Sequence, residues 1–267
     1  PWKLVTRRRV LPLRTVSLPA PAASSEELLE AVWSGVTDRT RVVCVSHITF
    51  TTGTILPITE LSARCAARDI VLAVDGAHPP GMIQMDLNTL GGDFYASSPH
   101  KWLLAPQGTG LLYIAEPWRE KWDDMTLGAH RFNHMGTMDE SRIAGLLAAT
   151  EFFHALGMQR VEGRVRYLRG MLQDGLMHIP GLSLATPSDN ALNAAMVSFR
   201  IDGVESLDLQ AHLSRAAKVR TRVIGEYDYG WMRLSTHIYN SPGDVARVLE
   251  LLDDAARNGV PARDGRP

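Results

Sequence analysis

The chain has 267 residues, of which 45% are hydrophobic and 21% are charged, enough for one large domain or for a large and a small one. The 28 Lys and Arg residues nearly balance the 29 Asp and Glu residues, so the net charge does not favour a nucleic-acid partner. No apolar run is long enough to cross a bilayer, and the first residues lack the order of a signal peptide. We therefore expect a cytoplasmic protein without membrane contact.

The two cysteines, Cys44 and Cys65, do not have the spacing of a zinc site or a redox pair. Both stand among apolar residues, so we expect both in the core, where a free cysteine behaves as a small hydrophobic residue. So few cysteines fit a reducing compartment. The histidines also lack metal-ligand spacing, and we expect no metal ion.

The first residues, Pro1–Leu4, include no initiator methionine and resemble the middle of a domain. We expect that an N-terminal part is missing. The basic cluster Arg7–Arg9 is interpreted as the solvated edge of a strand, and Pro19–Ser25 as a short linker.

A nearly continuous β-branched run from Arg41 to Ile48 predicts a strand buried on both faces of a parallel sheet. Apolar residues then recur at helical spacing from Ile58 to Cys65, and a second buried strand follows at Ile70–Asp75. This order is typical of a βαβ unit. Two further strands are predicted at 94–96 and 110–114.

The aromatic and charged segment 116–136 has little periodicity and is interpreted as an extended loop. Alternating patterns then predict helices at 141–156, 161–177 and 206–217, and strands at 194–201, 219–224 and 231–236. The last helix has clear end signals. Ser241 is placed to cap it, Pro242 to begin it, Asp244 to complete a capping box and Gly259 to end it.

The pattern indicates an α/β fold with a larger unit at 1–140, a smaller α/β unit at 141–260 and a tail at 261–267. Ligands of open α/β sheets bind beyond the carboxyl ends of the strands. In this sequence, polar residues directly follow the carboxyl ends of two predicted strands.

The run Asp75-Gly76-Ala77-His78 follows one strand, and the run Ser98-Pro99-His100-Lys101 follows another, so the two are expected to converge. An aspartate can pair with a protonated pyridine nitrogen, and a lysine amine can form an imine with a carbonyl cofactor. Pyridoxal phosphate needs both groups, an aspartate at its ring nitrogen and a lysine at its carbonyl carbon. Taken singly, Lys101 is also consistent with a surface lysine, and Asp75 with a turn residue or helix cap.

Several motifs together resemble the class-V aminotransferase family of pyridoxal-phosphate enzymes. They are Val45-Ser46-His47, Asp75-Gly76-Ala77-His78, Asp93-Phe94-Tyr95, His100-Lys101-Trp102-Leu103, Pro106-Gln107-Gly108-Thr109-Gly110 and the run from Met232 to Asn240. The similarity is greatest to the isopenicillin N epimerase-like group, which is related to cysteine desulfurases. It implies a fold-type-I transferase with a mainly parallel large domain, incomplete at its N-terminus, and a smaller C-terminal α/β domain.

The resemblance also implies roles for individual residues. Lys101 would form the internal Schiff base with pyridoxal 5'-phosphate, and Asp75 would pair with its pyridine nitrogen. His78 would contact the ring hydroxyl. Ser98 and His100 would hold the phosphate.

Two more residues carry roles by the same resemblance. Thr137 would reach the phosphate of the neighbouring subunit's cofactor, which implies a homodimer with the site at the interface. Arg233 would bind the α-carboxylate of the substrate, a task suited to a planar bidentate guanidinium. The residue alone is also consistent with a salt bridge to Asp228 or with a solvated face.

The resemblance implies a reaction at the α-carbon of an amino acid or small peptide, and epimerisation by proton transfer at Lys101 is the leading hypothesis. An aminotransferase and a cysteine-independent C–S lyase remain open. A persulfide-forming desulfurase is disfavoured because no cysteine follows Cys65, and because Phe50 stands where desulfurase-like relatives tend to have an asparagine. A hypothesis of another class is that the chain is a truncated, inactive fragment.

Overall fold

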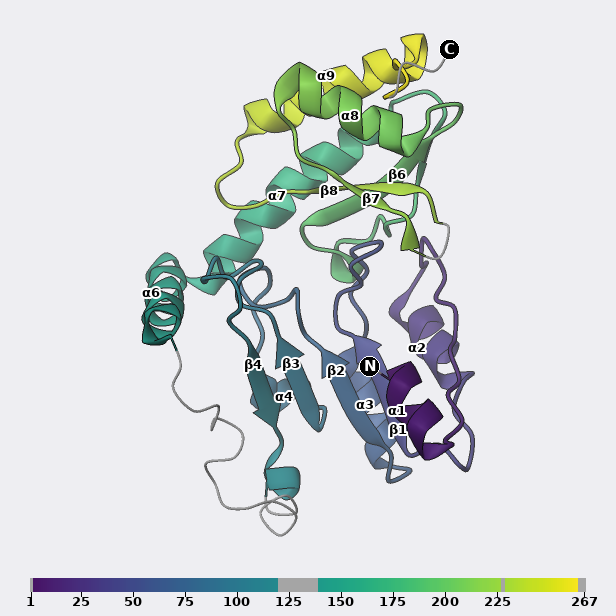
Figure 1. The fold of residues 1–267 in the computed structure, drawn as a ribbon, viewed down its shortest axis with the longest axis vertical. Helices are drawn as coiled ribbons and strands as arrows, with labels where there is room; N and C mark the ends of the chain where they lie inside the picture. The colour runs from purple at the N-terminus through teal and green to yellow at the C-terminus, as the bar shows by residue number, and fades with distance from the viewer. Residues whose placement is uncertain (1, 120–138, 227–228, 264–267) are drawn as a thin grey trace.

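The computed structural model describes residues 2–119, 139–226 and 229–263, which form two sheets with helices packed on them (Figure 1). The first sheet has the order β1-β2-β3-β4. Its strands are β1 (Val42–Ser46), β2 (Val71–Asp75), β3 (Phe94–Ser97) and β4 (Leu111–Ile114). The first three strands are parallel and β4 is antiparallel to β3, so the predicted βαβ unit is confirmed.

Three helices cover one face of the first sheet and form its core. They are α2 (Ser25–Trp33), α3 (Ile58–Ala66) and α4 (Leu87–Leu90). Leu29, Leu61 and Cys65 of the first two helices pack against Val43 and Tyr95 of the sheet. Their burial removes apolar surface from water, which is the main favourable term in folding. The carboxyl ends of β1, β2 and β3 point toward the second sheet (Figure 1).

The prediction that β1 is buried on both faces is wrong. Successive strand residues point to opposite faces, and α2–α4 cover only the face that carries Val43. Val42 is 42% exposed and Cys44 is also exposed. The prediction that both cysteines lie in the core therefore holds only for Cys65, which is 1% exposed.

The N-terminal segments also differ from the expectation. The cluster Arg7–Arg9 forms the last turn of a helix, α1 (Trp2–Arg9), and not the edge of a strand. Cationic side chains are favourable there because they face the negative end of the helix dipole. The expected linker ends in the N-cap of α2, where the Ser24 hydroxyl accepts a hydrogen bond from the amide of Glu27 (3.1 Å).

The second sheet is antiparallel throughout, in the order β5-β6-β8-β7. Its strands are β5 (Leu182–Leu184), β6 (Met196–Ile201), β7 (Arg222–Ile224) and β8 (Trp231–Ser235). The helices of this half are α6 (Glu140–Leu156), α7 (Met158–Leu176), α8 (Ser206–Ala217) and α9 (Pro242–Asn258), all four of which were expected from the sequence. The predicted capping box of Ser241 and Asp244 is present at the start of α9.

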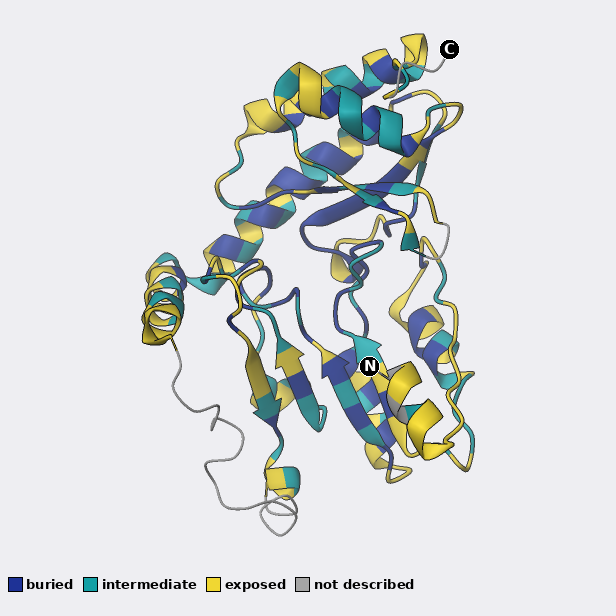
Figure 2. Cartoon of the chain, in the orientation of Figure 1, coloured by how far each residue is buried: buried dark blue, intermediate teal, exposed yellow. Residues whose placement is uncertain are grey.

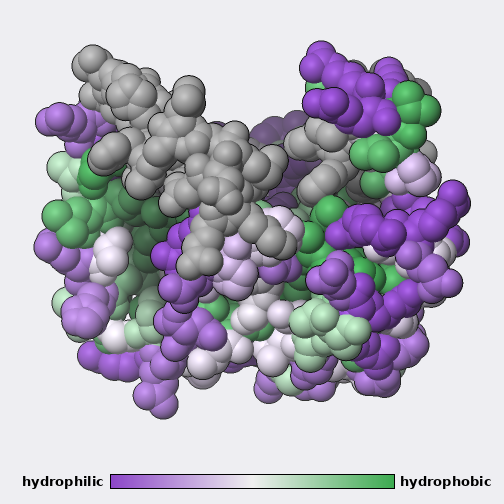
Figure 3. All heavy atoms as spheres, turned by 90° about the horizontal axis from the view of Figure 1, so that it is seen from below, coloured by the Kyte–Doolittle hydropathy of each residue, from purple (hydrophilic) through white to green (hydrophobic). Residues whose placement is uncertain are grey.

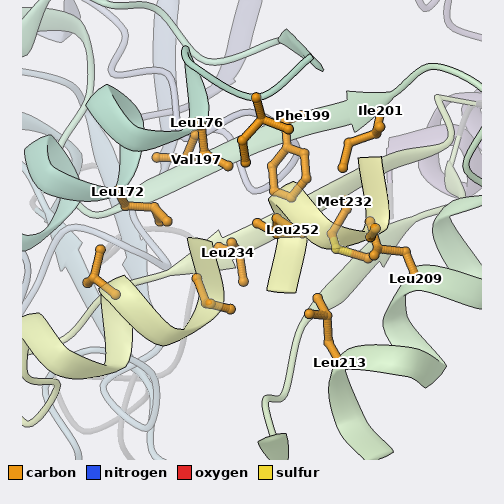
Figure 4. Close-up of a cluster of buried hydrophobic side chains, with 14 of the residues drawn as sticks. Leu172, Leu176, Val197, Phe199, Ile201, Leu209, Leu213, Met232, Leu234 and Leu252 are labelled. Atoms are coloured by element: carbon orange, nitrogen blue, oxygen red, sulfur yellow. The ribbon is translucent and has the colours of Figure 1, made fainter. Parts of the chain in front are cut away.

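The larger apolar core lies between this sheet and α7, α8 and α9 (Figure 4). Its buried side chains include Leu172, Phe199, Leu213, Met232 and Leu252. These helices all pack on one face of the sheet. The opposite face is thus left to meet the first sheet.

The two halves are joined by hydrogen bonds and by a mixed apolar cluster. The carbonyl oxygens of Phe50, Thr51 and Thr52, in the loop after β1, accept hydrogen bonds from the side chains of Arg233, Ser198 and Thr186. Ile48 and Trp102 of the first half pack with Val165 and Met196 of the second. The halves are therefore fixed against each other near the carboxyl ends of the parallel strands.

One side of the molecule keeps apolar side chains at its surface (Figure 3), and much of α6 on that side is exposed (Figure 2). In α6, Phe153 is buried but Ile143 and Leu147 are 53% and 59% exposed, and Leu112 of β4 is 54% exposed. Figure 3 shows hydrophobic surface on the side where α6 and β4 lie in Figure 1. Within the described residues, no helix has the length and hydropathy to span a membrane.

The turn after β2 depends on Gly76, because a Cβ atom there would lie 1.8 Å from the ring of Tyr95. We expect Gly76→Ala to lower the free energy of unfolding by about 1–3 kcal/mol, the usual cost of overpacking. Gly163→Ala in α7 is the control: its Cβ would meet nothing within 4 Å, so it is expected to stabilise by about 0.5–1 kcal/mol. Urea unfolding measures both, and equal effects would contradict the prediction.

Candidate active site

The site begins at the carboxyl end of β2, where Asp75 is exposed. Its Oδ1 accepts a hydrogen bond from the amide of Ala77 (3.0 Å), while the amide of Gly76 donates to the carbonyl of Ala96 (2.7 Å). The turn is therefore tied both to itself and to β3. The carboxylate of Asp75 therefore lies at the carboxyl edge of the first sheet, which faces the second half.

His78 follows in the same turn and is buried. Its Nδ1 accepts a hydrogen bond from Nε1 of Trp102 (3.0 Å), and its Nε2 lies 3.4 Å from Nζ of Lys101. Burial first, and then the charges of Lys101 and Arg233, lower the pKa of His78 to about 3. The ring is thus neutral at pH 7, and because Nδ1 is an acceptor its proton sits on Nε2, facing the lysine.

Lys101 lies in the turn after β3, where its amide donates to the carbonyl of Ser98 (3.0 Å). Burial of the amine and the charge of Arg233 lower the pKa of Lys101, whereas Asp75 opposes this shift. Only an uncharged amine has a lone pair for the Nε2 proton of His78. The lowered pKa increases the uncharged fraction of Lys101, which is the form that can act as a nucleophile or a base.

Arg233 lies in β8 on the face that meets the first half, opposite Ser198 of β6. It donates from Nη1 to the carbonyl of Phe50, and its Nε is buried without a partner among the described residues. Burial, and then Arg222, lower the pKa of Arg233 to about 10. The guanidinium remains charged at pH 7 and has a free donor.

These side chains border a pocket of about 470 Å³. Its lining consists of Phe50, His78, Lys101, Trp102, Arg222, Arg233, Ser235, His237 and Tyr239. The structure therefore brings together three residues expected from the sequence, His78, Lys101 and Arg233.

An aromatic stack forms one wall of the pocket. His237 stacks on Trp102 (centroids 5.3 Å apart, planes at 12°) and on Tyr239 (4.5 Å, 13°). His237 Nε2 donates to the carbonyl of Trp102 (3.0 Å), and its Nδ1 accepts from the amide of Ile238 (2.8 Å). No individual role was predicted for these three residues, although Trp102 adjoins Lys101 and the other two follow Arg233 closely.

Other expected site residues are placed differently. His100 is exposed and its Nδ1 donates to the carbonyl of Thr109 (3.1 Å). Neither His100 nor Ser98 lines the pocket, and Asp75 lies outside its lining although its charge reaches Lys101. Thr137 lies outside the described residues.

The donor set fits pyridoxal phosphate. It contains the amine of Lys101, the carboxylate of Asp75 and an N–H group on His78. In addition, the Nε of Arg233 has no hydrogen-bond partner among the described residues, which fits an anionic ligand nearby. Among the described residues, no group of His, Cys, Asp and Glu is arranged to hold a metal ion.

The hydrogen bond from Trp102 is expected to fix the tautomer of His78. Trp102→Phe keeps an aromatic ring beside His237 but removes the N–H donor, so the Nδ1–H tautomer of His78 becomes populated and the pKa of His78 rises from about 3. Long-range ¹H–¹⁵N correlation spectra report the tautomer at pH 7 and the pKa when they are recorded across a pH titration. Trp118→Phe is the control, because Trp118 donates to Asp93 (2.6 Å). An unchanged His78 spectrum in Trp102→Phe would show that another contact sets the tautomer.

Comparison with known proteins identifies the family. Residues 1–248 match the family described as "Aminotransferase class-V". The isopenicillin N epimerases of Amycolatopsis lactamdurans and Streptomyces clavuligerus are 33% and 32% identical, over 96% and 94% of this chain and 70% and 69% of their own lengths.

A solved structure shows the fold. The apo cysteine desulfurase of Thermococcus onnurineus superposes with a TM-score of 0.83 at 22% identity, covering 96% of this chain and 69% of that one. The expected fold type I, with a mostly parallel sheet and a further α/β unit, is thereby confirmed. The chain belongs to the class-V aminotransferase family of pyridoxal-phosphate-dependent enzymes.

Proposed function

We propose that this enzyme epimerises or racemises the α-carbon of an amino acid or small peptide. The observation that carries the proposal is the amine of Lys101, with its lowered pKa, in one pocket with the free donor of Arg233. The identity with two isopenicillin N epimerases, at 33% and 32%, supports this reaction over others of the family.

When bound, pyridoxal phosphate supplies a ring that withdraws electrons from the substrate α-carbon. The Asp75 carboxylate would hold the pyridine nitrogen and favour its protonated form, because a nearby negative charge stabilises a cation. His78 would donate a hydrogen bond from Nε2 to the ring hydroxyl oxygen. Ser98 and His100 are proposed to hold the phosphate, and Thr137 that of a neighbouring subunit's cofactor.

Arg233, which lines the pocket, would bind the α-carboxylate through its guanidinium group and so orient the α-hydrogen. Lys101 would then remove the α-proton at Nζ, and epimerisation follows when a proton returns to the opposite face of the carbon. Its depressed pKa brings the amine closer to the ideal for a general base near neutral pH. The stacked wall of Trp102, His237 and Tyr239 limits access of water on one side.

Two alternatives within the family remain, an aminotransferase and a cysteine-independent C–S lyase. The relative called a probable cysteine desulfurase from Xylella fastidiosa is 27% identical. In this chain Cys44 is on the open face of β1 and Cys65 is buried in α3, and neither lines the pocket, so they do not support a persulfide route. The relatives favour an enzyme over an inactive fragment.

We also propose that the protein is a homodimer. The support is the apolar surface of α6 and β4, where Ile143, Leu147 and Leu112 are each more than half exposed. Contiguous exposed apolar surface of this kind marks an interaction site. The helix leads out of the segment that contains Thr137, the residue expected to reach a neighbouring cofactor.

The variant Lys101→Arg tests whether Lys101 binds pyridoxal phosphate covalently. It keeps the positive charge but removes the primary amine, so the visible absorbance band gained on adding pyridoxal phosphate is expected to vanish and activity to fall by at least about 10³-fold. Lys218→Arg, on the exposed end of α8, is the control and should keep both. A band that survives in Lys101→Arg would rule out this lysine.

Assays of the same protein preparations distinguish epimerisation, transamination and C–S cleavage. Epimerisation predicts loss of optical activity and exchange of the α-hydrogen for solvent deuterium, without keto acid. Accumulation of keto acid, or release of sulfide from cysteine, would instead establish the aminotransferase or the lyase.

Leu147→Glu tests the dimer. A charge on this apolar surface is expected to weaken association by about tenfold or more, because burying it unpaired costs about 1–3 kcal/mol. Met177→Glu is the matched control, since Met177 is 56% exposed and Leu147 59%. Analytical ultracentrifugation measures the dissociation constant. A monomeric wild type, or equal effects of both variants, would contradict the proposal.

A further inference from the structure

Arg222 and Arg233 face each other across two strands. They are partners in the antiparallel register of β7 and β8, and both line the pocket. Cross-strand partners point to the same face of a sheet, and like charges directly opposite are destabilising. The sheet therefore holds two guanidinium groups together beside Lys101.

The positive charge of the two arginines is not neutralised by any carboxylate that lines the pocket. Its lining contains two guanidinium groups, those of Arg222 and Arg233, beside the amine of Lys101, and no carboxylate. Outside the lining, Glu226 accepts a hydrogen bond from Arg222, and the two side chains are 40% and 54% exposed. An exposed ion pair of this kind contributes little to stability, so Arg222 is readily released to another anion.

The two arginines are held differently. Arg233 is anchored by its hydrogen bond to the carbonyl of Phe50 and keeps one buried, unpartnered donor, which a single anionic group would satisfy. Arg222 has its own exposed partner, at the open side of the same cavity. Two guanidinium groups with different partners, beside the aromatic rings of Phe50 and Tyr239, suit a molecule that carries two anionic groups.

We propose that Arg222 selects substrates that carry a second carboxylate, with the α-carboxylate on Arg233 and the distal carboxylate on Arg222. Arg222 is thus a specificity-determining residue. This inference rests on the proposed function, which places the α-carboxylate on Arg233. Arg222 exchanges Glu226 for the distal carboxylate, so the second charge offsets the repulsion between the arginines.

Unreactive carboxylates of matched chain length test the selection. Glutarate and adipate are titrated by calorimetry against pentanoate and hexanoate, into the protein with and without pyridoxal phosphate. We expect the dicarboxylate to bind about tenfold more tightly than its matched monocarboxylate, as one charge-assisted hydrogen bond would give. Arg222→Gln is expected to abolish this ratio and leave the dissociation constant of the monocarboxylate within about twofold.

Two further variants define the result. Arg233→Gln is expected to weaken both kinds of ligand, and Arg220→Gln, an exposed arginine outside this pocket, to weaken neither. A ratio unchanged in Arg222→Gln, or an equal loss for both ligands, would overturn the inference. A protein that keeps the ratio but gains no visible band with pyridoxal phosphate disproves the proposed function alone, and one that gains the band but shows no ratio disproves this inference alone.

Discussion

The pocket depends on how the loop after β1 docks on the second sheet. Three successive carbonyl groups, at Phe50, Thr51 and Thr52, find their donors on side chains of the other half. Buried carbonyls without donors are costly, so separating the halves would leave several groups unsatisfied at once. The same contacts place Arg233 above the carboxyl ends of β2 and β3. Binding geometry and fold stability thus rest on one set of hydrogen bonds.

Trp102 couples the two sides of the pocket a second time. Its indole N–H holds His78 on the first half, while its carbonyl accepts from His237 of the second. A single residue next to Lys101 therefore sets the tautomer of one histidine and fixes the position of another. Both hydrogen bonds join uncharged groups, so they place no charge in the aromatic wall of the pocket. This leaves the charged groups of the site free to face the cavity.

Local patterns predicted the parts whose structure is locally determined. The capping box of α9 and the apolar runs of β1 and β2 fix their elements within a few residues, because their hydrogen bonds and periodicity lie within the segment. The convergence of His78 and Lys101 followed from a rule of parallel sheets. Arg233 was found only by family resemblance, since nothing in its own strand indicates which charge its side chain meets.

Features that depend on distant packing were not predicted. The exposure of Cys44 reflects which face of the sheet the helices cover, and the sequence of β1 is apolar on both faces. The role of Arg222 required the register of β7 against β8, which a three-residue strand does not encode by its pattern. Thr137 stays a prediction from the resemblance, as do the phosphate contacts of Ser98 and His100.

The electrostatics of the pocket follow from these constraints. The second sheet turns its apolar face to α7, α8 and α9, so Arg222 and Arg233 are left on the face that meets the first half. Their repulsion opposes folding, and the extensive core behind them offsets it. Functional sites commonly hold such unfavourable arrangements, which the surrounding structure enforces. An anion that enters the pocket removes a repulsion already present, and so gains more than it would from either arginine alone.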